Sequence, residues 1–220
     1  MSETKRRFVI IEDHPVVRER LNELVNREGD MEVCGEADTA QSGIDLVVSL
    51  RPDMIILDIT LNSSSGLELI KSLRALSITT PILVLSMHEE SLYAQRALRA
   101  GASGYINKNS PSGEVIKAAR QLLEGKVYLS AAMTEDVIQK LTQNPAAARR
   151  GGSIDRLSDR ELVVLEMIGR GRPPRAISET LGVGIATVET YRARIKEKMK
   201  LQNAFELQHF AIRWLREREG

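Results

Sequence analysis

Two different hydrophobic patterns divide the chain, and the change falls between residues 126 and 156. In the first part, short apolar runs of a strand's length alternate with apolar positions at helical spacing. Such alternation predicts a parallel sheet with helices on both faces and right-handed crossovers. We therefore expect a five-stranded, doubly wound (βα)5 domain over residues 1–126. The predicted strands fall at residues 8–11, 31–37, 54–57, 82–85 and 105–106.

From Leu157 onward the pattern is helical throughout. Ser158, followed three residues later by Glu161, predicts a capping box at the start of the first helix. A short helix at 175–181, a turn containing glycine and a longer helix at 186–200 form the arrangement of a helix-turn-helix. With a fourth helix at 204–218, residues 156–220 are expected to form a four-helix domain. The fold class is thus α/β plus all-α.

Residues 127–155 separate these two domains. Residues 130–141 carry apolar positions at helical spacing and predict one helix. Residues 142–155 are rich in Ala, Arg and Gly, with one Asn-Pro step, which is typical of a flexible linker.

Polar side chains follow four of the predicted strands, at the edge where ligands gather in open α/β sheets. Glu12 and Asp13 follow the first strand, Asp58 the third, Ser86 the fourth and Lys108 the fifth. Three carboxylates in one crevice require a neutralising cation, and hard oxygen ligands suit Mg²⁺. Each side chain has an ordinary structural explanation by itself, such as a strand-end cap or a surface lysine. Together they favour a site in which a hydroxyl and an ammonium hold a phosphoryl group and an aspartate attacks phosphorus.

This pattern resembles the receiver domain of two-component response regulators over residues 7–126. The resemblance is carried by the acidic pair in 9–15, the strand end at 56–58, Gly66, residues 85–86 and the segment 104–108. It implies that a partner histidine kinase phosphorylates Asp58. It also implies that Mg²⁺ is held by Glu12, Asp13, Asp58 and the backbone carbonyl of Thr60. Ser86 and Tyr105 would report the phosphate by a coupled reorientation, although Tyr105 by itself suggests only a core aromatic.

Asn62 departs from this family, whose members usually have a proline four residues after the phosphoacceptor. Losing proline adds backbone freedom. We expect a more mobile loop beside Asp58.

The longer helix of the second domain has an apolar face with Val188, Ile195 and Met199, and an opposite face that is largely basic. A basic helix after a turn suits the major groove of DNA, whereas a solvated helix in a small bundle gives the same pattern. The candidate DNA contacts are Arg175, Thr187, Glu189, Thr190, Arg192, Arg194, Lys196 and Lys200.

The second domain resembles the LuxR/NarL-type DNA-binding domain over residues 153–216. The matching positions are 157–161, 164–165, Ile177, Leu181, 187–188, Ile195 and 198–199. The resemblance implies a bacterial transcription factor whose fourth helix pairs with its copy in a homodimer. The apolar stripe at Leu207, Phe210, Ala211 and Trp214 fits that pairing, and it fits packing onto its own domain equally well.

Three residues depart from this second family: Glu189, Tyr191 and Ala193 stand where members often have basic or histidine side chains. Glu189 is repelled by phosphate, but it could accept a hydrogen bond from a cytosine amino group. We therefore expect a DNA site that differs from those of better-known relatives. Electrostatic affinity would then depend on Arg175, Arg192, Arg194, Lys196 and Lys200.

Net charge and composition also fit two domains with different functions. Residues 1–148 contain 16 Lys/Arg and 20 Asp/Glu, a net of −4, whereas residues 149–220 contain 15 and 10, a net of +5. An anionic partner is therefore expected for the second domain. Cys34 is the single cysteine, which excludes an intrachain disulfide and fits a reducing cytoplasm. No stretch approaches ~18 consecutive apolar residues and no signal peptide precedes the first strand, so we expect no membrane span.

These observations predict a cytoplasmic response regulator in which phosphorylation of Asp58 controls dimerisation and sequence-specific DNA binding. An Mg²⁺-dependent aspartyl phosphatase is an alternative, but Thr60 stands where a second carboxylate would act as general acid. Another alternative, suggested by Glu189, is an output domain that binds protein. Turnover of a small phosphate ester would support the first alternative, and failure to bind random DNA would support the second.

Overall fold

The computed structural model describes residues 4–61, 64–87, 90–131, 133–135 and 153–219. The chain forms two compact units, residues 1–142 and 143–220. The loop residue Asn62, most of the helix expected at 130–141 and the linker up to residue 152 lie outside the described residues.

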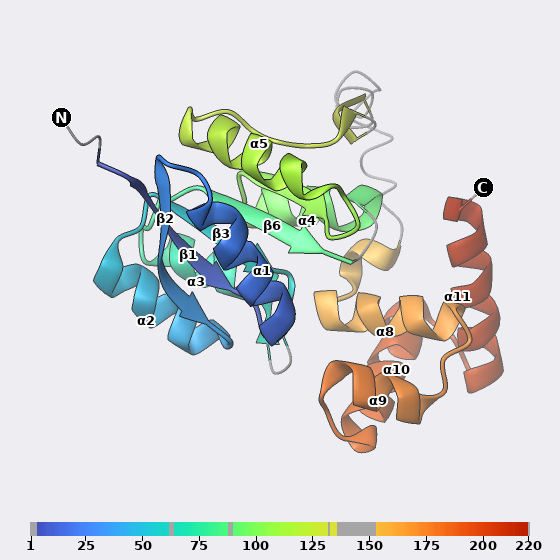
Figure 1. Cartoon of the computed structure of the whole chain (residues 1–220). Coiled ribbons are helices and arrows are strands. Elements are labelled where there is room, and N and C mark those ends of the chain that lie inside the picture. Colours follow the sequence, from blue (N-terminus) through green and yellow to red (C-terminus); the bar gives the residue numbers. More distant parts are fainter. Residues whose placement is uncertain (1–3, 62–63, 88–89, 132, 136–152, 220) are drawn as a thin grey trace. The chain divides into compact units, whose positions relative to one another are not determined.

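The first unit is built on a five-stranded sheet with the order β2-β1-β3-β6-β7, and its neighbouring strands pair in parallel. This confirms the predicted doubly wound sheet. Parallel pairing brings the carboxyl ends of the strands to one edge (Figure 1). The strands are β1 (Arg6–Ile11), β2 (Met31–Ala37), β3 (Met54–Asp58), β6 (Ile82–Ser86) and β7 (Gly104–Asn107).

Helices cover both faces of this sheet. Helices α1 and α5 contact each other over one face, and α3 contacts both α2 and α4 over the other. β1 shows why both faces need cover: Phe8 and Ile10 enter the core under α1 and α5, whereas Ile11 packs against Gly43 of α2. A continuous apolar run suits such a strand. The helices are α1 (Pro15–Asn26), α2 (Ala40–Leu50), α3 (Gly66–Ala75), α4 (Glu90–Ala100) and α5 (Ser112–Leu123).

A short antiparallel pair lies directly after Asp58, where the sequence predicts only a loop. β4 (Thr60–Leu61) pairs with β5 (Ser64–Ser65), with Thr60 opposite Ser65. The amide of Gly66 then donates to the carbonyl of Ile59 at 2.9 Å. A Cβ atom on Gly66 would lie 2.6 Å from the Asp58 carbonyl oxygen and 2.8 Å from the Ile59 Cα. Glycine therefore lets the chain return tightly against the end of β3.

We expect Gly66→Ala to lower the free energy of unfolding of the first unit by about 1–3 kcal/mol, because backbone cannot yield to the added methyl group. Gly113→Ala is the matched control, since nothing lies within 4 Å of its added Cβ. Urea unfolding measures both. Wild-type stability of Gly66→Ala would contradict the close approach.

The second unit is helical, as predicted. Its first helix begins with the expected capping box: Ser158 Oγ accepts from the Glu161 amide, and the Glu161 carboxylate accepts from the Ser158 amide. Gly182 adopts a left-handed conformation (φ 61°) at the turn before the longer helix. The elements are η1 (Ser153–Arg156), α8 (Asp159–Gly169), α9 (Pro174–Leu181), α10 (Ile185–Met199) and α11 (Ala204–Glu219).

The apolar stripe of α11 packs onto its own unit. Leu207 and Ala211 are fully buried, and Trp214 is nearly so. α8 and α11 approach so closely that a Cβ atom on Gly169 would lie 2.7 Å from the Ala211 carbonyl oxygen. Of the two roles that the sequence allows for this stripe, the structure therefore shows the packing role.

Candidate functional site

An acidic cluster lies at the carboxyl edge of the sheet, where the sequence places it. Glu12 follows β1 and Asp58 ends β3, and their side chains are 1% and 3% exposed. Lys108, which follows β7, places its Nζ 2.7 Å from Glu12 Oε2 and 2.8 Å from Asp58 Oδ2. Three strand ends therefore bring together two buried carboxylates and one ammonium. Asp13 completes the acidic set with a side chain that is 3% exposed.

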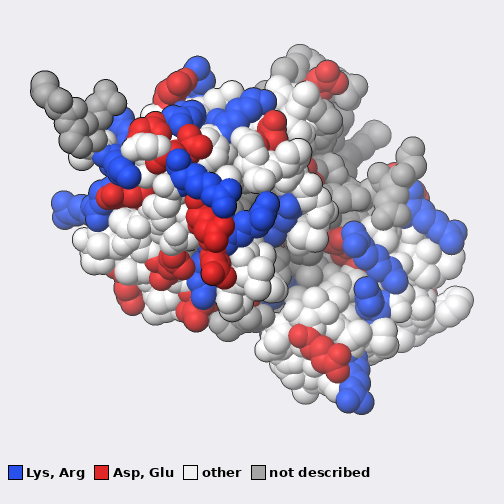
Figure 2. Space-filling model, viewed as in Figure 1, with Lys and Arg blue, Asp and Glu red and all other residues white. Residues whose placement is uncertain are grey.

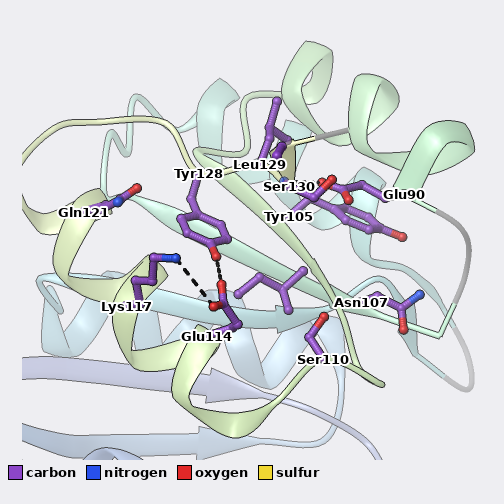
Figure 3. A pocket seen from close by; sticks show the side chains of 12 residues that line it. Glu90, Tyr105, Asn107, Ser110, Glu114, Lys117, Gln121, Tyr128, Leu129 and Ser130 are labelled. Atoms are coloured by element: carbon purple, nitrogen blue, oxygen red, sulfur yellow. Dashed lines mark hydrogen bonds and ion pairs between the residues drawn. The ribbon is translucent and has the colours of Figure 1, made fainter. Parts of the chain in front are cut away.

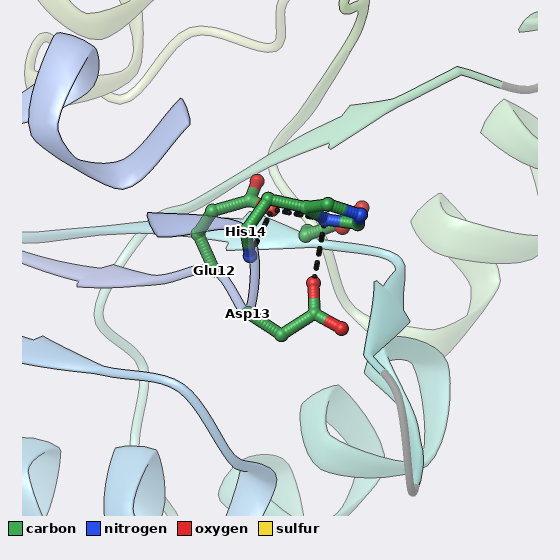
Figure 4. A group of neighbouring side chains, drawn as sticks. Glu12, Asp13 and His14 are labelled. Atoms are coloured by element: carbon green, nitrogen blue, oxygen red, sulfur yellow. Dashed lines mark hydrogen bonds and ion pairs between the residues drawn. The ribbon is translucent and has the colours of Figure 1, made fainter. Parts of the chain in front are cut away.

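His14 belongs to the same cluster, although it is not among the site residues predicted from the sequence. Its Nδ1 lies 3.0 Å from Glu12 Oε1 and 2.8 Å from Asp13 Oδ1 (Figure 4). His14 is the N-cap residue of α1 but its side chain makes no capping hydrogen bond there. Potential ligand atoms of Glu12, Asp13, His14 and Asp58 all lie within 4.8 Å of one another. The signal in the sequence is the position of a histidine directly after an acidic pair.

Burial dominates the electrostatics of Asp58. It raises the pKa of the carboxyl to about 6, with a further contribution from the Glu12 charge, while Lys108 acts in the opposite direction. For Lys108, burial alone would lower the pKa, but the two carboxylates outweigh it and raise the pKa. The lysine is therefore held as a cation between two acids. A phosphoryl group that arrived at Asp58 would meet this positive charge.

Backbone hydrogen bonds around Asp58 connect the ends of neighbouring strands. The Thr60 amide donates to Asp58 Oδ1 at 3.1 Å, which fixes one carboxylate oxygen. Ser86, the fully buried last residue of β6, accepts at its carbonyl from the Lys108 amide at 2.7 Å. The structure thus brings Ser86, Thr60 and Lys108 to the edge that holds Asp58.

Tyr105 lies elsewhere on β7, fully buried, and lines a cavity of about 450 Å³ between α4, α5 and the segment after α5 (Figure 3). Its amide donates to the Tyr128 carbonyl at 3.0 Å, and the Tyr128 hydroxyl donates to Glu114. The core therefore continues past α5 to Tyr128, which apolar spacing within α5 does not indicate.

The predicted DNA-contacting face lies on α10 in the second unit. Val188 and Ile195 are fully buried against the other helices. Arg192 contacts Glu189 at 2.9 Å, and Arg175 on α9 contacts Glu179 at 3.3 Å. The side chains away from the buried face are exposed at Thr187, Glu189, Thr190, Arg194 and Lys200, and half-buried at Arg192 and Lys196.

Both units match known families. Residues 8–120 match the family described as "Response regulator receiver domain", and residues 155–211 match "Bacterial regulatory proteins, luxR family". The chain belongs to the LuxR-type response regulators. This response regulator is 34% identical to the nitrate/nitrite response regulator protein NarL of Escherichia coli over 201 residues, which are 90% of this chain and 91% of NarL. It is 33% identical to the oxygen regulatory protein NreC of Staphylococcus carnosus, over 94% and 97% of the two chains.

Among solved structures, a LuxR-family two-component response regulator from Aurantimonas sp. SI85-9A1 is 30% identical to this response regulator. The similarity covers 64% of this chain and 100% of the other, with a TM-score of 0.59. The chain is therefore a two-component response regulator with a LuxR-type DNA-binding domain, and not an aspartyl phosphatase or other catalytic enzyme. Within the described residues, no helix has the length and apolar character needed to cross a membrane.

Proposed function

We propose that Asp58 accepts a phosphoryl group from a partner sensor histidine kinase, and that this modification controls DNA binding by the second unit. The observation that carries the proposal is the buried Asp58 carboxylate with Lys108 Nζ at 2.8 Å. In the transfer, an Asp58 oxygen forms a bond to phosphorus while the bond from phosphorus to the donor imidazole breaks. The leaving imidazole takes up a proton. Treatment with acetyl phosphate, followed by intact-mass measurement, should add one phosphoryl group, and no uptake would contradict the proposal.

We propose further that Glu12, Asp13, Asp58 and the Thr60 carbonyl hold Mg²⁺. The donor set fits this ion, because hard carboxylate oxygens lie close together and all three carboxylate side chains are 3% exposed or less. Bound Mg²⁺ screens the negative charge of an incoming phosphoryl group. His14 reaches the same oxygens and would have to release at least one of them to the ion.

Ser86 and Tyr105 are the residues that we propose to sense the phosphate. The Ser86 hydroxyl is suited to donate a hydrogen bond to a phosphoryl oxygen. The Tyr105 amide binds the Tyr128 carbonyl in the segment that follows α5, and Tyr105 lines the same cavity as that segment, so its displacement would disturb that segment. In these roles, Ser86 and Tyr105 would link phosphorylation of Asp58 to DNA binding by the second unit through a two-state conformational change.

The second unit, for which residues 156–220 are our proposed boundary, would place α10 in the major groove of DNA. We propose Arg175, Arg192, Arg194, Lys196 and Lys200 as phosphate contacts, and Thr187, Glu189 and Thr190 as residues that face base edges. We bound the first unit at residues 1–126, and on its visible face acidic and basic side chains intersperse (Figure 2). The net positive charge of residues 149–220 is therefore the better pointer to an anionic partner.

Lys196→Ala should weaken binding to all DNA sequences and flatten the dependence of log K on log salt by about 0.9, the slope that one released counterion contributes. Fluorescence anisotropy at several salt concentrations measures this slope. Arg213→Ala, which removes an exposed charge from α11, is the matched control and should leave the slope unchanged. An unaltered slope for Lys196→Ala would remove Lys196 from the interface.

We propose that the active form is a homodimer that acts in the cytoplasm, because the DNA-binding unit must reach the chromosome. With Leu207, Ala211 and Trp214 buried within the unit, pairing through α11 would use its outer face. There Phe205 is 77% exposed and stacks on His209, with ring centroids 6.4 Å apart.

A further inference from the structure

One basic residue of α10, Lys198, reaches back to α8, although its side chain is still 36% exposed. Lys198 Nζ lies 2.6 Å from Glu161 Oε2, and the Glu161 side chain is only 2% exposed. The same Oε2 accepts from the Ser158 amide at 2.7 Å. One buried carboxylate oxygen therefore joins the N-terminal cap of α8 to the last turn of α10. Figure 1 shows α8 and α10 packed against each other in this unit.

The buried Glu161 carboxylate is stabilised in its charged form. Desolvation would raise the pKa of the Glu161 carboxyl, but the Lys198 ammonium and the Ser158 amide outweigh it and hold the pKa below its ordinary value. The carboxylate thus remains charged next to its lysine. Charge-assisted hydrogen bonds of this kind are directional.

Apolar contacts fix α10 in a different way. Val188 and Ile195 are fully buried and set how closely the helix packs, but such contacts are non-directional. Toward the carboxyl end of the helix, Met199 is only half-buried. A directional contact at Lys198 therefore limits rotation of α10 about its own axis. Rotation matters because base readout requires side chains to be held within about 0.5 Å and 10–20° of the productive geometry.

The residues just before α8 connect this ion pair to the linker. η1 contacts α10 and is followed at once by buried Leu157 and by Ser158, whose amide binds Glu161. The chain therefore enters the unit at the point where Glu161 holds α10.

We propose that Lys198 is a positioning residue: its ion pair with Glu161 sets the rotation of α10 and with it the choice of DNA sequence, while Lys198 itself contacts no DNA. The inference rests on the proposed DNA-binding role of α10. It separates Lys198 from Lys196, which we assign to a phosphate contact.

The test compares variants of the full chain on two duplexes, one selected by the acetyl phosphate-treated wild type from a random pool and one with the same bases scrambled. Lys198→Met keeps most of the stem and removes the charge, and Lys198→Arg is the conservative replacement. Arg170→Met is the matched control, because it also breaks a pair with a buried carboxylate of α8, Glu166 at 2.7 Å, but does not involve α10. Thermal unfolding of each variant accompanies the binding titrations.

For Lys198→Met we expect about a 10-fold loss of affinity for the selected duplex, which is on the scale of one lost base contact. The loss of affinity for the scrambled duplex should be about 2-fold or less. The slope of log K against log salt should be unchanged. Lys198→Arg should recover most of the loss, and Arg170→Met should keep wild-type selectivity. An equal loss on both duplexes with a flatter salt slope would make Lys198 a phosphate contact. Wild-type selectivity of Lys198→Met, or the same loss in Arg170→Met, would also overturn the proposal. A wild-type chain that selects no DNA would refute the proposed function itself, and the role of Lys198 with it.

Discussion

Asp58→Asn should take up no phosphoryl group from acetyl phosphate. The amide oxygen of asparagine is a poor nucleophile, and an amide cannot form the acyl phosphate that a carboxylate forms. Asparagine has nearly the same size, and the Thr60 amide can still donate to its Oδ1. The fold should therefore persist. Loss of the carboxylate removes the cost of burying its charge and its repulsion from Glu12, and Lys108 keeps Glu12 as a partner at 2.7 Å. The variant should therefore be no less stable than the wild type in the absence of metal.

Asp53→Asn is the matched control for this experiment. Asp53 lies at the opposite end of the same strand, just before Met54, where its carboxylate accepts from the Arg7 amide at 2.8 Å. It should take up the phosphoryl group as the wild type does. Intact mass and peptide mapping measure uptake in both variants, and normal labelling of Asp58→Asn would place the phosphoacceptor elsewhere.

Lys108→Met should strongly destabilise the first unit. The Lys108 side chain is 11% exposed and lies between two carboxylates that are still more deeply buried. Removing one partner of a buried ion pair typically costs about 3–5 kcal/mol, because the remaining charges are left uncompensated. Asp58 can relieve part of this cost by taking up a proton, since its pKa already lies near 6.

Mg²⁺ should rescue this variant. A divalent ion supplies the positive charge that Lys108 provided, so stabilisation by Mg²⁺ should be greater for Lys108→Met than for the wild type. Calorimetric unfolding with chelator and with Mg²⁺ measures both effects. Lys126→Met is the matched control, because its pair with Glu124 is exposed to solvent and contributes little to stability. If the two lysine variants lost equal stability, the cluster at Asp58 would not be the buried site described above.

Much of this site follows from local patterns in the sequence. The apolar run before Asp58 predicts a buried strand, and parallel strands must place Glu12, Asp58, Ser86 and Lys108 at one edge. The capping box at Ser158 is equally local and is confirmed. These features depend on residues within one element or on the regular geometry of a sheet, which is why pattern alone suffices.

Other features depend on contacts that no local pattern encodes. The β4–β5 pair has only two residues in each strand, too few to show an alternation. The His14 ring turns back onto the acids that precede it, which is a choice of rotamer. Lys198 and Glu161 are separated by 37 positions. Leu207, Ala211 and Trp214 of α11 are buried within their own unit, with Gly169 close to Ala211, and helical spacing does not predict this contact.

The central claim is that the state of Asp58 governs DNA binding by α10. Selection of bound DNA from a random pool, performed with and without acetyl phosphate, tests it most directly when wild type and Asp58→Asn are run side by side. We predict that treatment of the wild type enriches a defined sequence more strongly, and that the two Asp58→Asn pools are the same. A treatment-dependent difference that survives in Asp58→Asn, or no enrichment by the wild type in either state, would contradict the account.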